Sequence, residues 1–226
     1  MKKLFIISLF AIIAQYSLSQ NTQFGFEIYG GLSNYMDKYT ELADHKFKMS
    51  YGGTLLVDFK LKEKMYLQSG LGYINNGNAF EFNDAHDVYG EPMDFESKGS
   101  TTQNYIIVPL NLRFTNLGKF KKLEIVAGLY YAYMLSSVER SKGYIDEGEL
   151  IRWDTKRNQT KELENLNRHD LGLNAELHRK IATLGKLNIN LGLYGKLGFL
   201  PTQKNNDYGY SNYSFGLKTI VRLKSE

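Results

Sequence analysis

The chain has 226 residues and no cysteine, it is rich in glycine (21), tyrosine (17) and phenylalanine (13), and its formal net charge at pH 7 is +4. The absence of cysteine excludes a disulfide framework, thiolate chemistry and a lipid anchor on an N-terminal cysteine. Lysine and arginine are scattered and form no basic stripe interleaved with aromatic residues, so we expect no nucleic-acid partner.

Residues 1–19 are predicted to be a secretory signal peptide. Two lysines precede an apolar run over residues 4–14, and this run is shorter than the roughly 18 residues of a membrane-spanning helix. Ser17 and Ser19 are small residues that suit the positions before a cleavage site. Residues 20–226 are then expected to form one exported domain.

Eight segments of the exported domain alternate between apolar and polar or glycine residues. In chain order they cover residues 24–32, 49–60, 65–73, 106–114, 123–131, 170–178, 187–199 and 213–223. A period of two places each set on one face of a β-strand. Segments of roughly ten residues have the length that crosses a bilayer at a tilt.

One face of these strands is almost purely apolar, whereas the other is rich in glycine and carries charges of both signs. We therefore expect an all-β protein, an eight-stranded antiparallel up-and-down transmembrane β-barrel with its apolar face toward lipid. Eight strands leave an interior that side chains fill, so the inward charges are predicted to pair in the lumen. The predicted lumen charge network consists of Glu27, Asp58, Arg113, Glu124, Glu176, Lys196 and Lys218.

The connections between the predicted strands alternate strictly in length. Long loops are predicted at residues 33–46, 76–102, 136–167 and 201–209, and short turns at 61–64, 115–121 and 179–185. Barrels of the bacterial outer membrane have short periplasmic turns and long extracellular loops. The pattern therefore predicts an outer-membrane location with outer-membrane lipid as the surroundings.

Aromatic residues gather near the ends of the predicted strands. Tyr73, Tyr131 and Tyr133 belong to the loop side, and Phe24, Phe59 and Phe114 to the turn side. Two levels of amphipathic rings are typical of the two interfaces of a membrane. Tyrosine and phenylalanine are also good strand formers in general, which is the simpler interpretation of the same residues.

The exported chain resembles the PorT-like outer-membrane β-barrel family over its whole length. The resemblance is carried by Ser19-Gln20, Phe24-Gly25-Phe26, Gly70-Leu71-Gly72-Tyr73, Tyr105-Ile106-Ile107-Val108-Pro109-Leu110 with Leu112-Arg113-Phe114, and Ala127-Gly128-Leu129-Tyr130. It implies the barrel fold and, through the namesake of the family, an association with protein secretion across the outer membrane.

The segment 136–167 is the least ordinary of the predicted loops. It contains the only tryptophan of the chain, and Arg152, Trp153 and Arg157 are predicted as a candidate interaction patch for a protein partner or a surface polysaccharide. A β-hairpin that extends the neighbouring strands beyond the membrane is the simpler alternative. The two interpretations are compatible with each other.

No catalytic, cofactor-binding or metal-binding residues are predicted. Ser33, Asp44 and His45 share one loop region, but their spacing matches no catalytic signature. The acidic stretch 81–91 with His86 does not match a calcium-binding loop, so a solvated loop is favoured. His178 continues the inward register of its strand and is expected to be a hydrogen-bonded structural residue.

The leading functional hypothesis is a non-enzymatic outer-membrane barrel whose long extracellular loops engage a partner, in envelope structure or protein secretion. One alternative is a barrel-type lipid hydrolase, which requires a histidine bonded to a serine at the rim of the barrel. The other is a soluble lipocalin-like binder of a hydrophobic ligand, which would hold its apolar face inside.

Overall fold

The computed structural model describes residues 22–36, 44–86, 92–117, 120–146, 150–162, 166–202 and 211–223. The predicted signal peptide, residues 1–19, lies outside these ranges. Within them, no helix is long and apolar enough to cross a membrane.

The described residues form ten strands and one short helix. In chain order they are β1 (Thr22–Met36), β2 (Asp44–Lys46), β3 (Lys48–Lys62), β4 (Met65–His86), β5 (Pro92–Leu117), β6 (Phe120–Asp146), β7 (Leu150–Asn158), α2 (Gln159–Glu162), β8 (His169–Leu184), β9 (Leu187–Gly198) and β10 (Ser211–Leu223).

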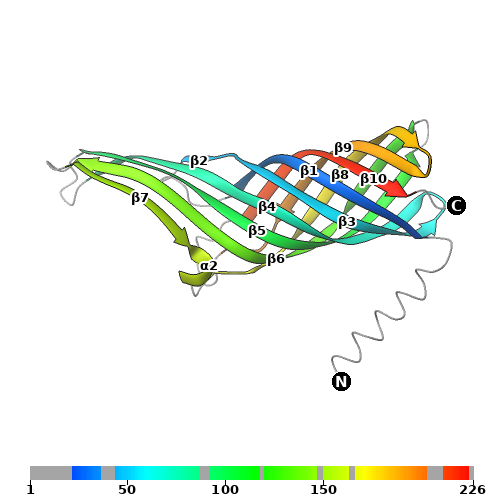
Figure 1. Cartoon of the computed structure of the whole chain (residues 1–226), viewed down its shortest axis with the longest axis horizontal. Helices are drawn as coiled ribbons and strands as arrows, with labels where there is room; N and C mark the ends of the chain where they lie inside the picture. The colour runs from blue at the N-terminus through cyan, green and yellow to red at the C-terminus, as the bar shows by residue number, and fades with distance from the viewer. Residues whose placement is uncertain are drawn as a thin grey trace, which may run out of the picture.

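Eight of the strands close into a ring in the order β1, β3, β4, β5, β6, β8, β9 and β10, with β10 paired back to β1. Every pairing is antiparallel. The two remaining strands lie outside the ring, where β2 pairs with β4 and β7 pairs with β6. The predicted eight-stranded up-and-down barrel is therefore confirmed (Figure 1).

Three strands continue far beyond the barrel. β4, β5 and β6 have 22, 26 and 27 residues, compared with 12 in β9, and together with β7 they project from one end of the molecule (Figure 1). We call residues 79–86 of β4, 92–100 of β5, 138–146 of β6 and 150–158 of β7 the distal sheet. The prediction of loops at 76–102 and 136–167 was therefore wrong over most of their length, whereas the hairpin alternative for 136–167 matches β6 and β7.

The opposite end of the barrel has short connections. β3 and β4 are joined through the two residues Glu63 and Lys64, and β8 and β9 through Gly185 and Lys186. Gly185 has a φ of 58°, in the left-handed region that glycine adopts without strain. The predicted turn at 179–185 was placed too early, because the polar residues after His178 still belong to β8.

The apolar side chains of the barrel point outward and the polar ones inward. Leu55, Leu129 and Leu193 are exposed on the outside, whereas Asp58 and Lys218 are fully buried. A soluble binding barrel would have the opposite arrangement. The lipocalin-like alternative is therefore wrong, and the outer surface is the one that a lipid environment requires.

The lumen also contains an apolar layer that the alternation did not predict. It consists of Tyr29, Ile74, Tyr105, Ile107, Tyr130, Ala132, Met134 and Tyr194, with Leu166 from outside the strands. Glycines on neighbouring strands leave room for the rings. A Cβ at Gly52 would lie 2.5 Å from the Tyr29 ring, and one at Gly172 would lie 2.6 Å from the Tyr130 ring. The narrow lumen is thus filled by large side chains packed against glycine backbone.

Candidate functional site

The outer face of the distal sheet continues the outward, apolar face of the barrel, but its side chains are charged. On β6 the outward residues Tyr131, Tyr133 and Leu135 are followed farther along the strand by Arg140 and Lys142. A shift in the β5–β6 register leaves Leu135 unpaired between the two regions. The change from apolar to charged residues along one continuous face marks the place where the strands leave the lipid.

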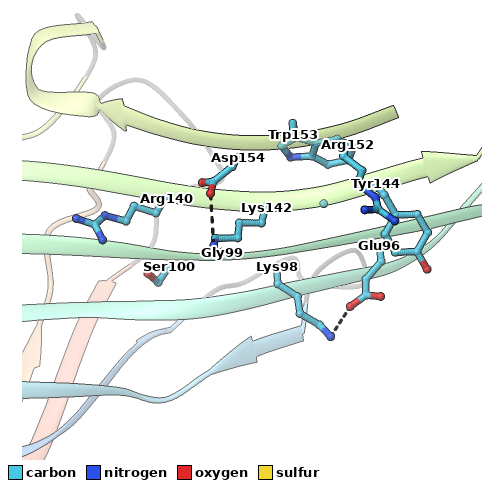
Figure 2. A pocket seen from close by; sticks show the side chains of 11 residues that line it. Glu96, Lys98, Gly99, Ser100, Arg140, Lys142, Tyr144, Arg152, Trp153 and Asp154 are labelled. Atoms are coloured by element: carbon cyan, nitrogen blue, oxygen red, sulfur yellow. Dashed lines mark ion pairs between the residues drawn. The ribbon is translucent and has the colours of Figure 1, made fainter. Parts of the chain in front are cut away.

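Three rows of side chains cross the outer face of β5, β6 and β7. From β5 through β6 to β7, the first row consists of Ser100, Arg140 and Lys156. The second row consists of Lys98, Lys142 and Asp154, and the third of Glu96, Tyr144 and Arg152. Successive rows alternate with residues that point to the other face. The rows therefore form one side of the sheet, and Figure 2 shows these side chains together except for that of Lys156.

These rows line a groove of about 940 Å³, which we call the outer-face groove. Its lining residues are Glu96, Lys98, Gly99, Ser100, Arg140, Lys142, Gly143, Tyr144, Arg152, Trp153 and Asp154. The polar members come from three strands that pair side by side over long stretches, so the floor of the groove is a continuous sheet. The groove is thus positioned by the same strands that build the barrel.

Part of the positive charge in and beside the groove is paired. Lys142 Nζ lies 3.4 Å from Asp154 Oδ2, and Lys98 Nζ lies 2.8 Å from Glu81 Oε1 (Figure 2 shows the first pair). Lys98 also pairs with Glu96, and Lys46 of β2 pairs with Glu81. Both members of the Lys142–Asp154 pair are well exposed, so water screens their attraction.

The structure divides the predicted interaction patch between two faces of the sheet. Arg152 lies in the outer-face groove. Trp153 also belongs to the groove lining, but it pairs in register with Gly143, and a Cβ on Gly143 would meet the indole ring, so the ring itself covers the other face. Arg157 shares the parity of Trp153 and therefore lies on that face as well. The three residues are neighbours in sequence but do not form a single patch.

The predicted lumen charges lie inside the barrel and form two clusters. In the first, Asp58 Oδ2 lies 3.3 Å from Arg113 Nη2 and 3.0 Å from Arg222 Nε. Glu124 Oε2 pairs with the same two arginines, at 3.3 Å from Arg113 Nη1 and 3.1 Å from Arg222 Nη1. Gln68 donates a further hydrogen bond of 2.9 Å to Asp58. One buried and one partly buried carboxylate thus face two guanidinium groups near the short-turn end.

The second cluster is centred on Lys218, whose ammonium group is fully buried. Its Nζ donates to Glu27 Oε2 at 2.8 Å and to Glu176 Oε1 at 2.7 Å. His178 Nε2 lies 2.8 Å from the other oxygen of Glu176. Lys196 lies 4.8 Å and 4.9 Å from the ring centres of Tyr29 and Tyr194, a cation–π arrangement. Together with the apolar layer, the clusters fill the cross-section of the lumen.

Two groups of important residues were missing from the sequence prediction. Arg222 has the inward parity of Lys218 and could have been assigned to the charge network from its strand register alone. The groove residues Arg140 and Lys142, and Lys156 beside the groove, lie in a segment that was predicted as a loop. Their signal is an alternation of charged residues rather than of apolar ones, which a search for amphipathic strands does not find.

The histidines with described side chains contact polar groups other than serine. His45 Nδ1 lies 2.8 Å from the Asn78 amide nitrogen, and His169 Nδ1 lies 2.6 Å from the Tyr131 hydroxyl. Ser33, which the sequence analysis placed in the same loop region as His45, hydrogen-bonds to the backbone of Gly77 instead. The side chains of residues 83–95, including His86 in the acidic stretch, lie outside the described residues. Among those described, no group of three or more metal-binding side chains is found.

The family model described as "Outer membrane protein beta-barrel domain" matches residues 13–204. Among curated proteins, none matches the sequence significantly. The chain is similar to the solved structure of Ail, the attachment invasion locus protein of Yersinia pestis, at 10% identity and a TM-score of 0.38, covering 90% of this chain and 99% of that one.

Two further similar structures are Neisserial surface protein A and the outer membrane protease OmpT of Escherichia coli. The first has 10% identity and a TM-score of 0.33 and covers 89% of this chain and 96% of that one. The second has 7% identity and a TM-score of 0.37, with coverage of 90% and 96%.

Proposed function

We propose that this protein, which belongs to the outer membrane protein beta-barrel domain family and lies in the bacterial outer membrane, is a non-enzymatic barrel that binds a partner at the cell surface. The barrel anchors the distal sheet, and the outer-face groove is the binding site. The observation that carries the proposal is the continuity of β5 and β6 from the lipid-facing barrel into a charged groove of about 940 Å³.

The packed lumen supports binding rather than transport. Lys218, Asp58 and the tyrosine rings occupy the interior of an eight-stranded ring, and a ring of this size has room for side chains but not for an aqueous channel. Among the side chains that the structure describes, His45 contacts Asn78 and His169 contacts Tyr131, and these pairs favour a role other than hydrolysis, because a serine nucleophile needs a base within hydrogen-bond distance.

A role in protein secretion is a second candidate, and it rests on the resemblance to the PorT-like family. The feature that favours it is a group of exposed lysines at the short-turn end, Lys60, Lys62 and Lys64. In a secretion component this periplasmic rim would meet the other members of the apparatus. The two candidates therefore assign function to opposite ends of the molecule.

Complementation of a deletion strain separates the two candidates. One variant carries Arg140→Gln, Arg152→Gln and Lys156→Gln in or beside the groove, and the matched control carries Lys60→Gln, Lys62→Gln and Lys64→Gln. Cell aggregation, surface attachment and secreted protein are measured. We expect the groove variant to behave like the deletion and the rim variant to behave like the wild type. The opposite result would support the secretion role, and turnover of phospholipid or peptide by the purified wild type would contradict a non-enzymatic protein.

A further inference from the structure

The groove places like charges directly opposite each other on neighbouring strands. Lys98 faces Lys142 between β5 and β6, and Arg140 faces Lys156 between β6 and β7. Like charges at directly opposed positions destabilise an antiparallel pair. Two such pairs in adjacent rows therefore carry an electrostatic cost, which an anion bound between them would remove.

The carboxylates of the face neutralise only part of this charge. In the part of the chain that the structure describes, Lys98 and Lys142 have carboxylates within ion-pair distance. Arg140, Arg152 and Lys156 form no ion pair with a described carboxylate. Arg140 and Arg152 lie in two rows of the groove, and Lys156 lies at its edge. These three cations can therefore hold successive anionic groups of an extended ligand.

The position of the cations favours a ligand outside the bilayer. Val138, which shares the outward parity of Arg140, is the last outward apolar residue of β6 before the charged rows, and Arg140 and Tyr144 lie two and six residues beyond it. At about 3.3 Å per residue and a tilt of about 40°, they lie about 5 Å and about 15 Å above Val138 along the membrane normal. The headgroup layer is roughly 5–8 Å thick on each side. The row of Arg140 therefore lies at the level of the headgroups, whereas the row of Tyr144 and Arg152 lies beyond the reach of lipid phosphates.

The chemistry of the groove favours a glycan over an acidic protein. Protein interfaces are usually centred on buried aromatic or aliphatic anchors, whereas Trp153 directs its ring to the opposite face. Tyr144 is the aromatic ring on the outer face, and it pairs with Arg152 and Glu96 in one row. A planar ring beside charged donors suits a sugar that bears anionic groups.

We propose that the outer-face groove binds an acidic polysaccharide, with anionic sugar groups between the paired rows of cations and the chain running along the strands. This inference rests on the proposed surface-binding function and specifies its ligand class.

Binding of the purified full-length protein in nanodiscs to dextran sulfate tests this inference, with unsulfated dextran of the same length as the neutral control. We expect saturable binding to dextran sulfate that weakens as salt rises, and no binding to dextran. The triple variant Arg140→Gln, Arg152→Gln, Lys156→Gln should bind at least about tenfold more weakly. The rim variant Lys60→Gln, Lys62→Gln, Lys64→Gln should bind like the wild type. Heat-modified gel migration checks that each barrel is folded.

Absence of binding to dextran sulfate, or equal binding by the wild type and the groove variant, would overturn the inference. So would equal affinity for polyglutamate of the same charge, which would indicate an acidic protein as the ligand. In any of these cases the surface-binding function still stands if the groove variant fails to complement the deletion strain. If instead the groove variant complements fully, the proposed function itself is wrong.

Discussion

The barrel and the distal sheet are built from the same strands, yet their faces are opposite in polarity. In the barrel, Leu129 of β6 is exposed on the outside and Val126 is buried inside among polar neighbours. In the distal sheet, Lys142 of the same strand lies on the outside, and the Trp153 ring covers the other face over Gly143. An alternation of period two runs through both regions. The surroundings, lipid or water, therefore decide which residue type can occupy the outward positions.

Removing the charge of a buried lysine should lower the free energy of unfolding far more than removing that of an exposed lysine. Lys218→Met removes the ammonium group shared by Glu27 and Glu176 and leaves two carboxylates without their partner in the lumen. We expect the free energy of unfolding to fall by about 3–5 kcal/mol. Lys142→Met in the distal sheet removes an exposed pair and should change it by less than about 1 kcal/mol. Urea titration in lipid vesicles, followed by heat-modified migration, measures both.

A new positive charge on the outward face should also distinguish the two regions. Leu129→Arg places a guanidinium group near the middle of the apolar band, where we expect a loss of about 2–4 kcal/mol in folding free energy. Tyr144→Arg on the same strand adds the charge in water and should cost less than about 1 kcal/mol. The same urea titration applies. Equal losses at both positions would mean that Leu129 does not face lipid.

Replacing an inward and an outward glycine of the barrel by alanine compares the two faces of the barrel itself. A Cβ on Gly52 would meet the Tyr29 ring at 2.5 Å, whereas one on Gly195 would meet no atom within 4 Å. Gly52→Ala should therefore reduce the unfolding free energy by about 1–3 kcal/mol. Gly195→Ala is its matched control and should not be destabilising. An unchanged unfolding free energy for Gly52→Ala would contradict a packed lumen.

The smallest expected effect is the loss of a single surface carboxylate. Asp154→Asn removes the partner of Lys142 in a pair whose side chains are 76% and 70% exposed. We expect a change below about 1 kcal/mol in unfolding free energy at low salt and a smaller one at high salt. A large loss that salt does not reduce would indicate a buried role for this carboxylate.

The sequence predicted the barrel because lipid allows only apolar residues at outward positions. Leu171, Leu173 and Leu177 of β8, for example, alternate with Asn174 and Glu176, and this alternation is sufficient to define a strand and its faces. The same reasoning predicted that the lumen residues point inward. It did not predict which of them pair, because contacts such as the one between Arg222 and Asp58 depend on the register across the ring.

The distal sheet was missed for the opposite reason. Its outward face is charged, with Lys98 and Arg140, whereas the aromatic rings of its other face, Phe80 and Trp153, lie over Gly99 and Gly143. The period of two is still present in Arg152, Asp154 and Lys156 of β7. This period would also have separated Trp153 from Arg152 without a structure. The groove as a whole could not be predicted, because its lining joins the β6–β7 hairpin to residues 96–100 of β5, and that pairing depends on the register between β5 and β6.

In this structure β6 passes from lipid into water between Leu135 and Arg140, and the accessibility of its outward residues tests this passage directly. Because the chain contains no cysteine, single cysteines at Leu129, Arg140 and Tyr144 can be labelled selectively with a membrane-impermeant maleimide on intact cells. We predict rapid labelling at Arg140 and Tyr144 and protection at Leu129. Labelling of Leu129 at the rate of Tyr144, or protection of Tyr144 until the outer membrane is permeabilised, would contradict the account.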